Sequence, residues 1–97
     1  MHITIQVPEI SECAARRCGY NVDGCCHAQA ITVGHGLHAA CDTYMRSATH
    51  LAPAPRGGVG ACKVVACVHN ESFACHAQAI RVRMHDEHPD CATFRPR

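Results

Sequence analysis

Residues 26–33 read CHAQAITV, and residues 75–82 repeat this stretch as CHAQAIRV. A shift of 49 residues also aligns two earlier cysteines and an asparagine, Cys13, Cys18 and Asn21 with Cys62, Cys67 and Asn70. After one inserted residue, the later stretch CDTY at residues 41–44 matches CATF at residues 91–94. Self-similarity at a fixed spacing indicates one structural unit written twice.

The repeat divides the chain into a first module at residues 9–45 and a second module at residues 59–97. Each module reads C-x4-C-x2-N-x4-C-H-A-Q-A-I-x-V, followed by a loop and C-x-T-(Y/F). Residues 46–58 between them are rich in proline and glycine, with Pro53, Pro55, Gly57 and Gly58. This composition predicts a flexible linker.

Large apolar side chains are scarce in this chain of 97 residues, which has two tyrosines, two phenylalanines and no tryptophan. A module of this length buries too little apolar surface to fold on its core alone. Nine cysteines, about a tenth of the chain, indicate that cross-links supply the missing stability. Composition alone leaves both disulfides and metal open as the cross-link.

Short strands are predicted at residues 30–33 and 79–82, where branched and small or polar residues alternate. Residues 3–7 alternate in the same way before Pro8 ends the run. Residues 21–24, NVDG, are typical of a turn. We therefore expect a small, metal-stabilised, mostly β and irregular fold, in which two tandem homologous four-cysteine modules consist of short β-hairpins and loops.

Eight of the nine cysteines occupy repeated positions, four in each module, and four thiolates complete a closed structural zinc site. The predicted ligands of two zinc ions, one ion per module, are Cys13, Cys18, Cys26 and Cys41, and Cys62, Cys67, Cys75 and Cys91. Cys25 has no counterpart, because Ala74 stands at its place in the second module. We interpret Cys25 as an incidental thiol.

The amino terminus lacks the cationic start and long apolar run of a secretory signal, which favours a cytoplasmic protein. A reducing cytosol keeps thiols reduced, so the cysteine pattern favours metal over disulfides. No apolar stretch is long enough to span a bilayer. An iron–sulfur cluster on four cysteines, or a disulfide-stabilised pair of modules, stays open as an alternative.

Residues near the cysteines are not predicted to bind metal, and the two repeated histidines are expected either to support the sites or to lie on the surface. His27 and His76 each follow a ligand cysteine, and consecutive residues of an extended chain point to opposite faces. Asn21 and Asn70 are interpreted as turn residues. Thr43 and Thr93 could donate their hydroxyls to cysteine sulfurs or simply pack against a strand. The other histidines are not placed alike in the two modules, could bind copper or nickel weakly, and receive no role.

The phrase C-x2-N-x4-C-H-A-Q-A-I-x-V with its later C-x-T-(Y/F) resembles the small bacterial family known as domain of unknown function 1540. The resemblance covers residues 13–44 and 62–94, so the chain looks like two such domains in tandem. It implies a metal-binding module and says little about the biological process. The many alanines and arginines are similar to those of proteins from bacteria with GC-rich genomes.

The function predicted from these features is that of a non-enzymatic zinc protein with two structural four-cysteine sites, which presents its loops to a protein partner. No phosphate-binding loop, H-E-x-x-H helix or nucleophile elbow occurs in the sequence. The formal net charge of +1 becomes about −3 when eight thiolates bind two zinc ions, which disfavours nucleic acid. The alternative is a protein that buffers or senses zinc or copper.

Overall fold

The structure, a computed structural model, describes residues 7–35 and 38–97. The strand predicted at residues 3–7 therefore lies almost entirely outside the described residues. Within these ranges no residue is helical, and no helix there could cross a membrane. The ten strands are β1 Glu9–Cys13, β2 Asn21–Val22, β3 Cys25–Cys26, β4 Ile31–His35, β5 His38–Cys41, β6 Val59–Cys62, β7 Asn70–Glu71, β8 Ala74–Cys75, β9 Ala79–His85 and β10 His88–Cys91.

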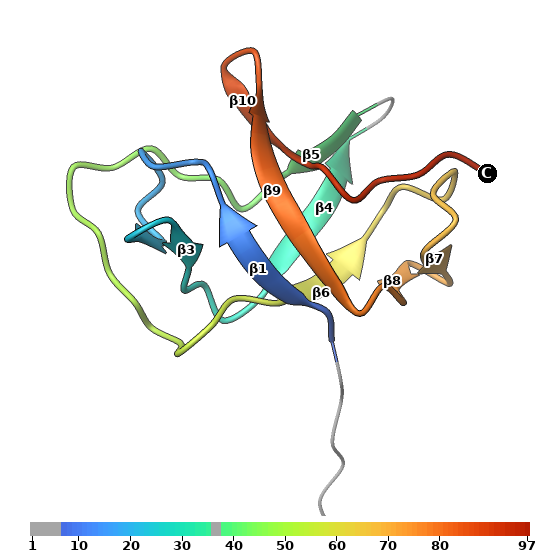
Figure 1. The fold of residues 1–97 in the computed structure, drawn as a ribbon, viewed down its shortest axis with the longest axis horizontal. Coiled ribbons are helices and arrows are strands. Elements are labelled where there is room, and N and C mark those ends of the chain that lie inside the picture. The colour runs from blue at the N-terminus through green and yellow to red at the C-terminus, as the bar shows by residue number, and fades with distance from the viewer. Residues whose placement is uncertain (1–6, 36–37) are drawn as a thin grey trace, which may run out of the picture.

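Six strands from both modules form one shared sheet in the order β1-β9-β10-β5-β4-β6 (Figure 1). The predicted strands at 30–33 and 79–82 correspond to the starts of β4 and β9. The first strand of each module pairs in parallel with a strand of the other module, so that Cys13 lies opposite Val82 and Cys62 opposite Val33. The two modules thus exchange their first strands.

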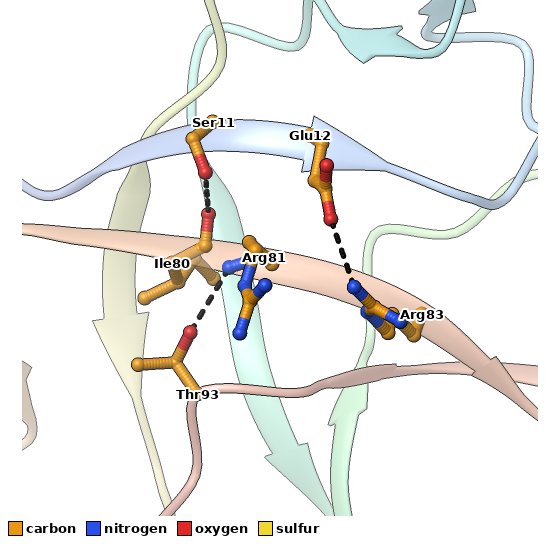
Figure 2. A network of polar contacts seen from close by, with 6 residues as sticks. All are labelled: Ser11, Glu12, Ile80, Arg81, Arg83 and Thr93. Atoms are coloured by element: carbon orange, nitrogen blue, oxygen red, sulfur yellow. Dashed lines mark hydrogen bonds and ion pairs between the residues drawn. The ribbon is translucent and has the colours of Figure 1, made fainter.

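Side chains also join the exchanged strand β1 to β9 (Figure 2). The Ser11 hydroxyl donates to the carbonyl oxygen of Ile80 at 3.1 Å. Arg83 Nη2 lies 3.3 Å from Glu12 Oε1 on the exposed side of the sheet. The contact between the modules is therefore made by backbone pairing and by side chains.

The sheet curls until its two edge strands meet at their beginnings, where Glu9 bridges Gly58. The Ile10 amide donates to the Gly57 carbonyl oxygen and the Val59 amide to that of Pro8, both at 3.0 Å. Since residues 8–10 and 57–59 are equivalent in the repeat, these two bonds are related by a pseudo-twofold axis. The antiparallel pairing of β5 with β10 relates the modules in the same way.

The core of the shared sheet is built from equivalent residues of both modules. Alternate residues of a strand face the same side, which places one set of small and branched side chains inside the curled sheet. This buried set is Ile10, Val59, Ile31, Ile80, Val33, Val82, Ala39 and Pro89. The modules therefore bury their apolar side chains against each other.

Two lobes flank the sheet, the first containing the β2–β3 hairpin and the second the β7–β8 hairpin (Figure 1). The linker between the modules is bonded to the first lobe. The amides of Leu51, Ala54 and Gly57 donate to the carbonyl oxygens of Gly19, His27 and Cys26. A Cβ atom at Gly57 would lie 2.7 Å from Cys26 Sγ, so only glycine permits this approach. Gly57 thus permits close packing of the linker against Cys26.

The two lobe hairpins differ at one turn position. Gly24 in the first lobe has φ 81°, and Phe73 at the equivalent position of the second lobe has φ 65°. A non-glycine residue in this left-handed region costs about 1 kcal/mol or more, and Phe73 is 61% exposed. Phe73→Gly should therefore raise the free energy of unfolding by about 1 kcal/mol, measured by urea titration.

The matched control for this prediction is Gly24→Phe, which should lower stability by a similar amount because it creates the same strain. A destabilised Phe73→Gly variant would contradict the interpretation, since it would mean that the phenyl ring contributes more by contact than its backbone loses by strain.

Candidate metal centres

The four repeated cysteines of each module line one small cavity between the shared sheet and a lobe. Cys13, Cys18, Cys26 and Cys41 line the first cavity, and Cys62, Cys67, Cys75 and Cys91 line the second. The cavity volumes are about 10 and 20 Å³. Each cavity therefore has room for roughly one water molecule or one ion.

Strand ends position three of the four cysteines in each module. Cys13 is the last residue of β1, Cys26 of β3 and Cys41 of β5. The fourth, Cys18, lies in a turn. Its backbone forms an isolated antiparallel bridge with Arg46, which follows the C-x-T-Y segment. The second module repeats this arrangement with Cys62, Cys75 and Cys91 at strand ends and Cys67 bridging Pro96.

All nine cysteines are free thiols. Among the described residues, no three or more His, Cys, Asp or Glu side chains are already arranged as the ligands of a metal ion. The cysteines of each module thus line a common cavity without closing on a point. Their sharing of one ion stays a prediction.

Burial raises the pKa of three thiols in the first cavity and of two in the second. The effect is largest at Cys41, where burial and the neighbouring sulfurs of Cys26, Cys13 and Cys18 raise the pKa to about 12. The pKa values of Cys13 and Cys26, and of Cys75 and Cys91 in the second module, are raised for the same reasons. A dication among these sulfurs would reverse the shift, because it stabilises the thiolates that burial and mutual repulsion disfavour.

Backbone amides oppose this increase at the same five sulfurs. In each case the amide two residues after the cysteine donates a hydrogen bond to Sγ and lowers the pKa; these donors are Ala15, Ala28, Thr43, Ala77 and Thr93. Hydrogen bonds from outer groups to ligand sulfurs are a regular feature of metal–thiolate sites. The arrangement suits charged sulfur better than neutral thiol.

The repeated asparagines tie the lobe hairpins to the exchanged strands. Asn21 Nδ2 donates to the Cys13 carbonyl oxygen at 2.9 Å, and Asn70 Nδ2 donates to that of Cys62 at 2.8 Å. Both asparagines are buried. Asn21 also accepts the Gly24 amide, which is the turn bond expected from the sequence. Each asparagine therefore fixes the position of the first cysteine of its module.

Each repeated threonine bonds to a strand backbone. Thr43 Oγ1 accepts the Thr32 amide at 3.1 Å, and Thr93 Oγ1 accepts the Arg81 amide at 3.0 Å (Figure 2). Thr43, just after Cys41, is thus bonded to β4, and Thr93, just after Cys91, is bonded to β9. Of the two roles considered from the sequence, the observed bonds correspond to packing against a strand.

The histidines that follow Cys26 and Cys75 do not line the cysteine cavities. His27 Nδ1 lies 3.0 Å from the Ala54 carbonyl oxygen in the linker, and His76 is exposed. Among the described residues, His69 lines the second cavity together with Cys67 and Cys75. Tyr20 occupies the equivalent place in the first module, so the repeat gave no signal for His69.

Cys25 lies outside the first cavity and pairs with Val22 in the β2–β3 hairpin.

The family described as Domain of Unknown Function (DUF1540) matches residues 12–49 and 61–94. The chain belongs to this family. The two matched segments are tandem DUF1540 domains, as the resemblance implied, and each contains the four repeated cysteines of one module. No curated protein and no solved structure matches the chain.

The DUF1540 matches together contain every cavity cysteine, yet each cavity also takes part of its wall from the other domain. Val82 and Pro89 of the second domain line the first cavity. Val33 and Ala39 of the first domain line the second cavity. The strand exchange therefore makes each cysteine cavity a joint product of both DUF1540 domains.

Proposed function

We propose that this protein is non-enzymatic and holds two zinc ions, one in each four-cysteine cavity, as structural supports. The observation that carries the proposal is the gathering of all four repeated cysteines around one small cavity in each module. Four thiolates fill the coordination shell of zinc and leave no position for water or substrate. A site of this kind supplies stability rather than Lewis-acid chemistry.

The size of the cavities supports a single ion in preference to an iron–sulfur cluster. Volumes of about 10 and 20 Å³ suit one small ion, whereas a four-iron cluster with its inorganic sulfides needs several times more room. The donor set also suits zinc, since soft thiolates bind this borderline-soft ion well. The residues present therefore fit the proposed metal.

The proposed cellular role is binding of a protein partner in the cytoplasm. The second lobe exposes apolar side chains, with Val65 59% and Phe73 61% exposed. Two zinc ions bound to eight thiolates would give the chain a net charge of about −3, which opposes attraction to the phosphates of nucleic acids. Exposed apolar groups on a rigid, metal-supported lobe suit recognition of another protein surface.

Native mass spectrometry of the full chain, purified without added metal, tests the proposal. We expect two zinc ions per chain, with thiol protons displaced by the metal, and a mass after metal removal in acid that shows nine reduced cysteines and no cystine. Cys25→Ser is the matched control, because it removes a thiol outside the cavity set and should retain both ions. A metal-free chain whose mass shows cystines would contradict the zinc proposal. A brown protein that contains iron and sulfide would show that the cysteines hold an iron–sulfur cluster instead of zinc.

Metal buffering is the second candidate function, and the exposure of the second cavity favours it. Cys75 and Cys91 are half-buried, whereas their counterparts Cys26 and Cys41 are buried. His69 adds another donor at this cavity. Four or more exchangeable ions per chain in the same mass spectra would favour buffering over structural support.

A further inference from the structure

A second group of metal-ligand side chains, made of histidines and carboxylates, lies at the ends of two neighbouring hairpins. Each hairpin carries His-x2-His, at residues 35–38 between β4 and β5 and at residues 85–88 between β9 and β10. In the sheet register, His35 lies opposite His38 and His85 opposite His88. The inserted residue of the second module obscured this repeat, so the expectation that these histidines are not placed alike was wrong.

The strand order brings these two hairpin ends together, because β10 pairs directly with β5. His85, His88 and Asp90 alternate with the inward-facing Val82 and Pro89, so they project from the outer face of the sheet. The rings of His38 and His85 have centroids 6.2 Å apart with planes inclined at 34°. Residues from both modules thus converge on one outer surface.

A groove of about 620 Å³ opens at this surface, and we name it the hairpin-end groove. Its lining combines three imidazoles, four carboxylates and one phenol with Ala40 and the cavity cysteine Cys41; the polar members are His38, His85, His88, Asp42, Asp86, Glu87, Asp90 and Tyr44. One lysine, Lys63, lies 3.7 Å from Asp42, and His88 Nδ1 lies 3.7 Å from Asp90 Oδ1. The groove is therefore strongly anionic and rich in nitrogen donors.

We propose that the hairpin-end groove binds one divalent transition-metal ion of the kind that prefers imidazole, with His38 and His85 as its central ligands. Two imidazoles on one ion place their ring centroids about 5 to 6 Å apart, given a metal–nitrogen distance of about 2.0–2.1 Å. The observed 6.2 Å is close to this separation. Small rotations of the two exposed rings bring them into reach of one ion.

Other side chains of the groove can complete this site. Asp86 and Glu87, in the turn between His85 and His88, attract the cation and offer oxygen ligands. His88 offers a third imidazole. No three of the described side chains converge on a point, so the site closes around the ion as it binds. Imidazole with carboxylate suits nickel, copper and zinc, and affinity rises from nickel to copper.

Cys41 lines both the first cavity and this groove, but the ligands proposed here are imidazoles and carboxylates, so the site is additional to the two proposed cysteine centres. It would respond to transition metals at concentrations that leave the cysteine-bound ions in place. Nickel is the suitable probe, since its binding is detected by paramagnetic broadening of nearby amide signals and by the mass of the complex.

The test is a nickel chloride titration of the full chain, followed by two-dimensional amide NMR and native mass spectrometry. We expect one nickel ion per chain and broadening centred on residues 38–42 and 84–90. His38→Gln and His85→Gln should each weaken nickel binding at least tenfold, and the double variant should abolish it. His76→Gln, which changes an exposed histidine outside the groove, should bind nickel as the unaltered chain does.

Nickel binding that survives the double variant, or that is lost equally in His76→Gln, would overturn the proposal. Nickel that enters only by displacing metal from the cysteines, with no histidine-dependent ion, would overturn it as well. The zinc count in the same spectra reports independently on the cysteine centres, so failure of either proposal is distinguishable from failure of the other.

Discussion

Replacing Cys75 and Cys91 together by serine should weaken metal binding in the first module, although neither residue belongs to the first cavity. Without its own metal, the second module loses the order of β9 and β10. Cys13 lies on β1, which is paired with β9, and Val82 and Pro89 form part of the first cavity wall. The remaining site should therefore lose roughly 5- to 150-fold in zinc affinity, the usual range for coupling between sites.

Competition with a chromophoric chelator measures this affinity in the full chain. The reciprocal variant, with Cys26 and Cys41 replaced by serine, should weaken the second site to the same degree, because coupling between binding sites is mutual. Cys25→Ser is the control for general effects of losing a thiol. Retention of the remaining site within twofold of its original affinity would show that the modules are energetically independent.

Removal of metal under reducing conditions should unfold both modules and not just loosen the lobes. Zinc in small cysteine modules contributes on the order of 10 kcal/mol or more, and domains are stable by only about 5–15 kcal/mol. The buried core is made of medium and small side chains, many of them the cavity cysteines themselves, which gives little reserve. Chelation should collapse the amide NMR dispersion, and zinc should restore it. A reduced, metal-free chain with native dispersion would contradict this expectation.

Metal retention should also depend on pH in a defined direction. Burial raises the pKa of Cys13, Cys26, Cys75 and Cys91, and that of Cys41 to about 12, which keeps these thiols protonated at neutral pH when no metal is bound. Zinc must displace these protons, so affinity rises with pH and is lost as the medium is acidified. Acid titration of the zinc-loaded chain should therefore release zinc and unfold the protein in one transition.

The sequence predicted the parts of the fold that depend on local pattern. The repeated phrase located the starts of β4 and β9, and the cysteines of the C-x4-C, C-H and C-x-T segments line one cavity in each module. It could not predict the strand exchange. Ile10 and Val59 are equivalent residues on equivalent strands, so pairing within a module and pairing across modules satisfy the same local pattern.

Two further features escaped the sequence for physical reasons. Glycines in the linker indicated flexibility, but Gly57 is there because no side chain fits beside Cys26 Sγ. The hairpin-end groove could not be predicted without knowing the order of β9, β10 and β5, which brings together residues of separate hairpins. Long-range strand order is the information that neither periodicity nor spacing contains.

Zinc K-edge X-ray absorption of the two-zinc form of the full chain probes the ligand atoms themselves. The coordination proposed for the two cavities predicts four sulfur neighbours per zinc at about 2.3 Å and no nitrogen or oxygen in the first shell. A first shell with two or more nitrogen or oxygen atoms would mean that the repeated cysteines do not share one ion in each half of the chain.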